Sequence, residues 1–214
     1  LGSPANELFD DFPDEPIASA SLGIVYKVKT KNNTFCAVKV QRPNLYFLIR
    51  RDVVILKILA TTFGSFLPLN IGVGIGEIID EFAKALFDEI DYEKEGENSL
   101  KFANFFKNNP NVFIPKLEKD FSSKRVITTS WIEGVKLRDR EILEQNNLIP
   151  SSFIRTCVIS GLQQLFEYGY FHADPHPGNM FALKGGSADS GHLAYVDFGM
   201  MDTITNSDRL TLIK

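Results

Sequence analysis

Apolar and polar positions alternate near the N-terminus in two short runs that are typical of β-strands. These runs, Ile24–Val28 and Phe35–Val40, are rich in β-branched residues. They flank the polar segment Lys31–Asn33, whose two asparagines favour a turn. We therefore predict a β-hairpin, preceded by an irregular segment that ends at Pro16.

Apolar spacings of three and four residues predict helices after the hairpin. Asn44 can cap a helix that runs to about Phe63, because Pro43 ends the preceding strand. A second helical pattern extends over Ile75–Lys107, and the segment Asn108–Asn111 interrupts it. We predict one continuous helix for this second pattern.

The second half of the chain returns to strands and then becomes helical. Val112–Lys116 and Arg125–Trp131 have the composition of strands, with a polar turn between them. A serine at position 151 or 152 caps a long helix to Tyr170, and His192–Val196 is a short apolar strand. Because the strands come mostly first and the helices mostly later, we predict an α+β fold with a sheet-rich N-terminal lobe and a helical C-terminal lobe.

Composition narrows the class of protein. The 214 residues are 44% apolar and 23% charged, which suits one globular domain with two lobes. A net charge of −4 gives no basic footprint for nucleic acid. The two cysteines, Cys36 and Cys157, lie in apolar surroundings and are predicted to be small buried side chains. The most apolar stretch, Val53–Leu69, falls short of the ~20 residues that span a membrane, so we interpret it as a core helix.

The strongest chemical signal is the run His172-Ala-Asp174-Pro-His176-Pro-Gly-Asn179. Asp174 and Asn179 have the spacing of the catalytic Asp and the Mg²⁺-binding Asn in the kinase pattern H-R-D-x-x-x-x-N. Asp197, in Asp197-Phe198-Gly199, follows an apolar strand as the metal-binding Asp of a D-F-G motif does. This combination predicts phosphoryl transfer with Asp174 as the catalytic residue and with Asn179 and Asp197 as metal ligands.

His172 and His176 also invite a zinc interpretation. Two histidines four positions apart bind zinc when they share one face of a helix. Pro175 and Pro177 disfavour a helix here, because proline removes a backbone donor and clashes with the preceding turn. We therefore expect the histidines to brace the loop.

Lys39 lies in Ala37-Val-Lys39-Val40 and is similar to the lysine of the kinase V-A-I-K motif, which contacts the α- and β-phosphates. Such a lysine requires a carboxylate on a helix, and Phe87–Asn98 is the richest acidic helical segment. Within it Asp91, Glu95 and Asn98 share one face.

The phosphate loop departs from ordinary kinases. Where glycines are expected, the chain has Ala18, Ser19, Ala20 and Ser21. Glycine lets backbone amides approach phosphates closely, so phosphate handling is expected to differ here. The later run Gly72-Val-Gly-Ile-Gly76 comes after Lys39 and is predicted to be a turn between helices.

Together these motifs resemble the UbiB family of atypical kinase-like proteins, also called aarF-domain kinases. The matching segments run in family order across nearly the whole chain, and they are Pro16–Ser21, Ala37–Pro43, Glu89–Asn98, His172–Asn179 and Asp197–Met201. The resemblance implies a protein-kinase-like fold with an alanine-rich loop and with helices inserted in the N-lobe. It places the N-lobe with its insert in residues 1–130, and the hinge and a truncated helical C-lobe in residues 131–214.

The resemblance also assigns roles to particular residues. Glu95 would be the ion-pair partner of Lys39, while Glu89 and Asp91 match an E-x-D motif that helps to shape the pocket. The hinge that contacts adenine would lie at Ser130, Trp131 and Ile132. The implied ligands are ATP or ADP with Mg²⁺. The family's K-x-G-Q element and most of the C-lobe helices lie outside the present sequence.

The family is linked to isoprenoid quinone and related lipid metabolism. The resemblance therefore implies an ATPase or atypical kinase that works with lipid or quinone precursors and with membrane-associated biosynthetic enzymes, in bacteria, plastids or mitochondria. A nucleotide-binding regulatory scaffold without turnover is an alternative that the alanine-rich loop favours. A small-molecule phosphotransferase is a further alternative, disfavoured by that loop and by Glu89-Ile-Asp91.

Overall fold

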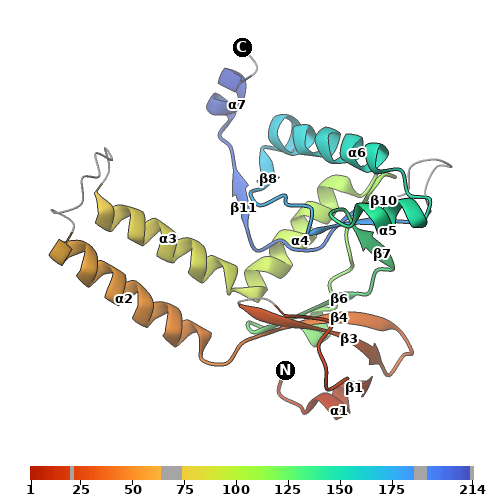
Figure 1. Ribbon diagram of the computed structural model, residues 1–214, viewed down its shortest axis with the longest axis horizontal. Coiled ribbons are helices and arrows are strands. Elements are labelled where there is room, and N and C mark those ends of the chain that lie inside the picture. The colour runs from red at the N-terminus through yellow and green to blue at the C-terminus, as the bar shows by residue number, and fades with distance from the viewer. Residues whose placement is uncertain (20–21, 64–73, 186–191, 213–214) are drawn as a thin grey trace.

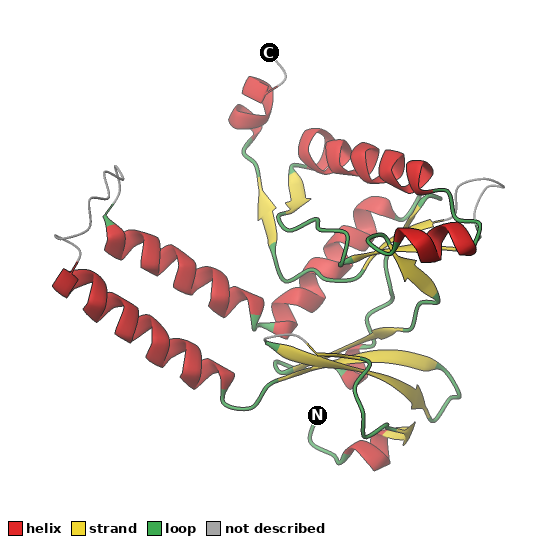
Figure 2. Ribbon diagram, viewed as in Figure 1, coloured by secondary structure: helices red, strands yellow, loops and turns green. Residues whose placement is uncertain are grey.

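The computed structural model describes residues 1–19, 22–63, 74–185 and 192–212 (Figures 1 and 2). The two larger sheets, the first built mostly from the N-terminal half of the chain and the second from the C-terminal half, lie on either side of a long helix, and a pair of helices extends to one side (Figure 1). This arrangement is the α+β fold that the sequence pattern predicts. Positions 20 and 21, and the first part of the predicted turn at Gly72–Gly76, lie outside the described residues.

The first sheet is antiparallel, in the order β1-β3-β4-β6, with β2 also paired to β3. Its strands are β1 (Phe9–Asp11), β2 (Ala18–Ser19), β3 (Gly23–Thr30), β4 (Phe35–Gln41) and β6 (Val126–Ser130). The predicted hairpin is therefore confirmed as β3 and β4. Asn33 takes the left-handed conformation in its turn, with φ 61°, which asparagine tolerates better than most residues. The register places Lys39 opposite Val25 on one side and Ile127 on the other.

The prediction of an irregular segment through Pro16 is wrong. A short helix, α1 (Ala5–Leu8), and strand β1 precede that proline. Phe9 is buried against Phe121, with ring centroids 5.3 Å apart, and β1 adds an edge to β3. A three-residue strand is too short to show a detectable alternation of apolar and polar residues. Tertiary aromatic contacts hold it in place.

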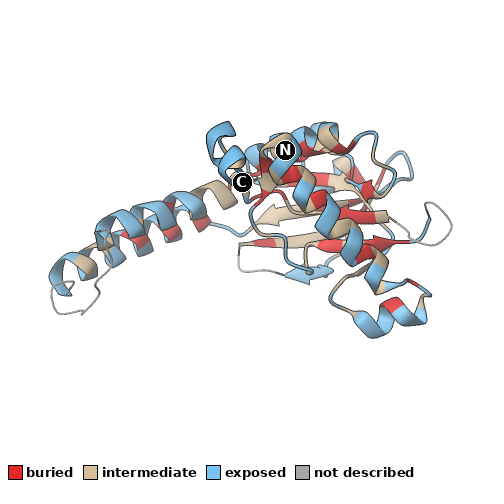
Figure 3. Ribbon diagram, turned by 90° about the horizontal axis from the view of Figure 1, so that it is seen from above, coloured by how far each residue is buried: buried red, intermediate tan, exposed pale blue. Residues whose placement is uncertain are grey.

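The inserted helices α2 (Leu45–Phe63) and α3 (Ile75–Glu89) form a hairpin that projects from the molecule (Figures 1 and 3). The inward face of the hairpin is a small apolar core that includes Ile49, Val53 and Ala83. Much of its remaining surface is exposed (Figure 3). The helix predicted from Asn44 to Phe63 is confirmed in position and extent.

The single helix predicted over Ile75–Lys107 is instead two helices. α3 ends at Glu89, and α4 (Tyr92–Phe106) starts after a turn in which Asp91 has φ −91° and ψ 90°. The carboxylate of Asp91 caps α4 by accepting a hydrogen bond from the backbone N–H of Lys94 at 3.2 Å. The side chain of Gln41 donates to the carbonyl of Ile90 at 2.7 Å, which ties this turn to the first sheet. The apolar period continues through the break and therefore hides it.

The second sheet has the order β5-β10-β9-β7, and β8 and β11 form a separate pair. These strands are β5 (Val112–Phe113), β7 (Gly134–Lys136), β8 (Tyr170–His172), β9 (Met180–Leu183), β10 (His192–Tyr195) and β11 (Met201–Thr203). The predicted strand Val112–Lys116 is shorter than expected, and it pairs with β10 in this sheet although it falls in the segment assigned to the N-lobe. The strand predicted at His192–Val196 is confirmed as β10. The strands β7, β8, β9 and β11 were not predicted, because backbone pairing between separate segments creates these short strands.

Helices of the C-terminal half cover this sheet. They are α5 (Arg140–Gln145) and α6 (Pro150–Gln163), which continues as a π-helix at Gln164–Tyr168. The helix α7 (Asn206–Leu212) follows β11 near the C-terminus, and Lys119–Phe121 forms a 3₁₀ turn before β6. The predicted long helix to Tyr170 is confirmed over most of its length. Gly169, with φ 62°, ends it in the left-handed conformation that favours glycine.

The main core joins α4 to the second sheet. Phe102 and Phe106 of α4 pack against Leu193, Tyr195 and Phe198. α4 also contacts β6 of the first sheet. Because both halves pack on one helix, the side chains of α4 are fixed relative to both walls of the space between the sheets.

No helix in the described part of the chain is long and apolar enough to cross a membrane. Cys36 is buried and Cys157 is half-buried, both as free thiols. These two residues therefore fit the predicted role of small apolar side chains.

Candidate nucleotide site

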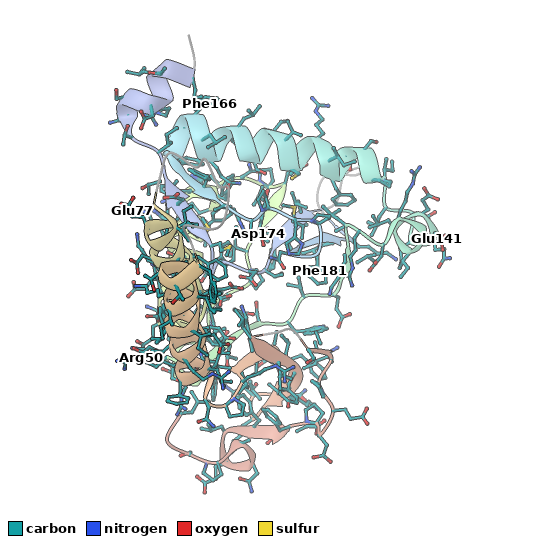
Figure 4. The ribbon with its side chains drawn as sticks, turned by 60° about the vertical axis from the view of Figure 1, so that its left-hand side comes forward. Arg50, Glu77, Glu141, Phe166, Asp174 and Phe181 are labelled. Carbon is teal, nitrogen blue, oxygen red and sulfur yellow. The ribbon has the colours of Figure 1, made fainter. Side chains whose placement is uncertain are left out.

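A cavity of about 900 Å³ lies between the two sheets. Its volume falls within the range of small-molecule and cofactor sites. The predicted site residues that line it are Ala18, Ser19, Lys39, Glu89, Glu95, Ser130, Trp131, Ile132, Asp174, Asn179 and Asp197. Figure 4 shows Asp174 and Phe181 between the lower sheet and the helical part above it.

Apolar side chains from both halves of the chain line part of the cavity. Val25 and Ala37 come from the first sheet, while Phe181 and Val196 come from the C-terminal half. An apolar lining of this kind suits an aromatic base. The hinge backbone follows β6, where the N–H of Trp131 donates to the carbonyl of Phe35 at 3.0 Å.

Sequence reasoning missed Val25, Ala37 and Phe181. A signal for Val25 was present, because Ala18, Ala20, Gly23 and Val25 have the spacing of G-x-G-x-x-G-x-V with alanine at the first two glycines. Lys136 and Arg138, which also line the cavity, gave no such signal.

Lys39 is the electrostatic centre of the cavity. Its ammonium lies 2.9 Å from Glu95 Oε2, 3.1 Å from Glu95 Oε1 and 3.3 Å from Asp197 Oδ2. The structure thus brings β4, α4 and the segment after β10 together at one cation. Glu95 is only 2% exposed, so this ion pair is well shielded from water.

The pKa values of these groups reflect burial and mutual attraction. Burial alone would lower the pKa of Lys39, but the carboxylates of Glu95 and Asp197 outweigh it and raise that pKa. Burial likewise opposes ionisation of Asp197, yet Lys39 and the backbone N–H of Gly199 hold its pKa below the ordinary value. Burial raises the pKa of Glu95 against the pull of Lys39. Lys39 therefore stays cationic and Asp197 anionic near neutral pH.

The segment after β10 is held in an inward arrangement. Phe198 is buried and packs on Phe102 of α4, with ring centroids 5.2 Å apart. Asn98 of α4 donates from its amide to the carbonyl of Phe198 at 2.9 Å and accepts from the hydroxyl of Tyr170 at 2.8 Å. These contacts fix Asp197 beside Lys39.

His172 braces the loop, as we predict from the two prolines that disfavour a helix here. Its Nδ1 accepts from the backbone N–H of Asp174 at 3.1 Å, which places the ring proton on Nε2. Nε2 then donates to the carbonyl of Asp197 at 2.6 Å. Both ring nitrogens are occupied by backbone groups, so His172 has no free lone pair for a zinc ion.

Short backbone turns set the spacing of Asp174 and Asn179. The N–H of His176 donates to the carbonyl of Asp174 at 2.9 Å, and the N–H of Asn179 donates to the carbonyl of His176 at 3.0 Å. Asp174 is half-exposed, with its carboxylate 3.6 Å from Nε2 of His176. Its position at the surface of the cavity makes it accessible to a second reactant.

Glu89 and Asp91 differ in their positions. Glu89 lines the cavity, and burial together with the charges of Asp197 and Asp174 raises its pKa. A cation bound between these carboxylates would relieve that repulsion. Asp91 is absent from the lining and caps α4 instead, so its predicted part in shaping the pocket is indirect, through the placement of Glu95.

The donor set fits Mg²⁺. Asp197 and Asn179 offer a carboxylate and an amide oxygen to the same cavity, with Glu89 as a further oxygen donor. Within the described ranges, no three His, Cys, Asp or Glu side chains gather closely enough to hold an ion by themselves. Mg²⁺ suits such an incomplete site, because it commonly uses one or two carboxylates and completes its shell with phosphate oxygens and water.

The β-sheet lobe, the ion-paired lysine, the catalytic-loop spacing and the inward Asp-Phe-Gly segment together define a protein-kinase-like fold. The chain belongs to the ABC1 atypical kinase-like domain family, which it matches over residues 1–214. This membership confirms the resemblance, since one Arabidopsis thaliana relative carries the name aarF domain-containing protein kinase.

Two relatives illustrate the likeness. The Synechocystis protein slr1919 is 43% identical over 212 residues, which cover 99% of this chain and 37% of that protein. ACTIVITY OF BC1 COMPLEX KINASE 1, chloroplastic, of Arabidopsis thaliana is 35% identical over 214 residues, covering 100% of this chain and 31% of that protein. The chain thus spans about a third of the length of these relatives.

A solved structure shares the fold. The Rv3197–erythromycin complex from Mycobacterium tuberculosis superposes with a TM-score of 0.73 at 26% identity, covering 94% of this chain and 49% of that one. The kinase-like fold is therefore shared beyond close sequence similarity.

Proposed function

We propose that this chain is an ATP- and Mg²⁺-dependent phosphoryl-transfer domain, acting as an ATPase or an atypical kinase. The observation that carries the proposal is the contact of Lys39 with both Glu95 and Asp197 in the cavity that also holds Asp174 and Asn179. Family membership supports it, because the family is described as atypical kinase-like. ADP would occupy the same site after transfer.

Each residue has a distinct part in this function. Lys39, held by Glu95, neutralises phosphate charge, and the apolar walls with the hinge backbone hold the base. Asp197 and Asn179 would hold Mg²⁺, which screens the phosphates and orients them for in-line attack. Asp174 orients the attacking water or hydroxyl group and accepts its proton.

The reaction that we propose serves isoprenoid quinone or related lipid metabolism, in association with a membrane. The chloroplastic relatives support a bacterial or plastid setting. The solved relative is described as a complex with erythromycin, and this supports a small molecule as the second ligand.

A regulatory nucleotide-binding scaffold is the second candidate. Ala18 lines the cavity at the position of a kinase glycine, and its Cβ limits how closely backbone amides can approach a phosphate. Looser phosphate contact would permit binding while slowing turnover.

Phosphate release from MgATP separates the two candidates. We expect Asp174→Asn to reduce turnover by about 10²- to 10⁴-fold, the usual contribution of a positioned general base. Nucleotide affinity should change little, since Asp174 lies at the surface of the cavity. Asp202→Asn, an exposed carboxylate on β11 outside the lining, is the matched control and should match the parent chain.

Two outcomes would argue against the enzymatic proposal. Undiminished turnover in Asp174→Asn would remove the role assigned to that carboxylate. Tight MgATP binding by the parent chain without any phosphate release would favour the scaffold.

A further inference from the structure

Tyr92 carries an unusual hydroxyl group. The side chain is only 2% exposed, and its oxygen is the one buried side-chain polar atom among the described residues that has no hydrogen-bond partner. Two other buried tyrosines satisfy theirs: Tyr195 pairs with Ser160 at 2.8 Å, and Tyr170 donates to Asn98 at 2.8 Å. An unpaired buried hydroxyl costs free energy of folding, so its retention requires an explanation.

The location of Tyr92 supplies an explanation for the unpaired hydroxyl. It is the first residue of α4, three positions before Glu95, and its ring centroid lies 5.0 Å from Nζ of Lys39. The hydroxyl lies against Gly23, the first residue of β3 after the alanine-rich loop, where an added Cβ would collide with it. Gly23 lines the cavity, so this hydroxyl lies against a residue of the cavity wall.

The chemistry of that space identifies the missing acceptor. Burial raises the pKa of Tyr92 to about 12, so the group remains a neutral O–H donor. Beside Lys39 and under a phosphate loop, the acceptor to be expected is an anionic oxygen. Loss of two glycines from that loop weakens its backbone donors and leaves a place for a side-chain donor.

We propose that the Tyr92 hydroxyl donates a hydrogen bond to a phosphate oxygen of the bound nucleotide, after a small displacement of the Gly23 backbone. This inference rests on the proposed function. It adds a phosphate-binding residue that neither the kinase motifs nor the predicted site contains. The hydroxyl is left unpaired in the protein because its partner belongs to the ligand.

Tyr92→Phe tests the proposal by removing the oxygen alone. We expect the dissociation constants of MgADP and MgATP to rise by about tenfold or more, because hydrogen bonds to charged groups are the strong ones. The dissociation constant of adenosine, which has no phosphate, should stay the same. The melting temperature without nucleotide should be unchanged or higher, since the variant loses an unsatisfied group.

Tyr195→Phe is the matched control. It deletes a hydroxyl that is paired with Ser160, so it should lower the melting temperature while the ratio of MgADP to adenosine affinity stays at the parent value. Equal weakening of adenosine and MgADP in Tyr92→Phe, or no change in either, would overturn the proposal. Failure of the parent chain to bind MgADP would instead overturn the proposed function beneath it.

A second pair of variants tests the geometry. Gly23→Ala should destabilise the parent chain, because the new Cβ meets the Tyr92 hydroxyl, and it should destabilise Tyr92→Phe less. Thermal unfolding of the two single variants and the double variant measures this coupling. An equal loss in both backgrounds would contradict the contact on which the proposal depends.

Discussion

Lys39 is outnumbered by carboxylates in its cavity. It contacts Glu95 and Asp197, and Glu89 and Asp174 line the same space. An anionic nucleotide would meet these negative charges, and Lys39 is already paired, although Lys136 and Arg138 also line the cavity. A divalent ion between the phosphates and the carboxylates changes that balance, which is the physical reason to expect strictly metal-dependent nucleotide binding.

The shifted pKa of His172 predicts how the free energy of unfolding depends on pH. Burial lowers its pKa in the folded protein below the ordinary value of 6.5. Between these two pKa values the unfolded chain binds more protons than the folded chain, so the free energy of unfolding falls as the pH drops below about 6.5. Denaturant unfolding measured from pH 7.5 to pH 5 should show this loss.

His172→Gln isolates the contribution of the imidazole. The variant is expected to be less stable at neutral pH, because two backbone contacts are altered, but its stability should vary less over the same pH range. An identical pH dependence in the variant would show that other groups cause the slope.

The helix α4 is the element on which the site depends. It presents Glu95 to Lys39 and Asn98 to the backbone of Phe198, while Phe102 packs against the second sheet. A shift of this one helix would change the ion pair and the position of Asp197 together. The break before α4 therefore sets where these side chains lie, since a continuous helix would point them elsewhere.

The cap that starts α4 is expected to contribute measurably to stability. Asp91→Ala removes the acceptor for the N–H of Lys94 and should lower the free energy of unfolding by about 1 kcal/mol. Asp139→Ala is the matched control, because Asp139 precedes α5 without a side-chain capping bond. Urea denaturation of both variants measures the difference, and equal losses would contradict the capping role.

Elements with strong local signals were the ones that the sequence revealed. The β3–β4 hairpin and α2 have clear periodicity, turn residues and a proline stop. The strands β7 and β9 of the second sheet do not, because they form by pairing between segments that are distant in the chain. The break at Ile90-Asp91 was hidden because capping changes the backbone direction without interrupting the apolar period.

At the scale of the whole molecule, much of the candidate site followed from spacing. Asp174, Asn179 and Asp197 each have a motif that fixes their order, and the structure places all three in one cavity with Lys39. The apolar walls did not follow, because residues such as Phe181 acquire their role only when the two halves face each other. Tyr92 is a further case, since its environment is created by α4 meeting Gly23.

The most direct test of the account is thermal unfolding with ADP or ATP, with and without Mg²⁺, on the parent chain and on Asp197→Asn. At about 100 times the dissociation constant, MgADP should add about 2.7 kcal/mol to the stability of the parent chain, a rise of several degrees in melting temperature. Without Mg²⁺, and in the variant, the rise should vanish. A folded parent chain that shows no rise, or an equal rise in the variant without metal, would contradict the proposed nucleotide site.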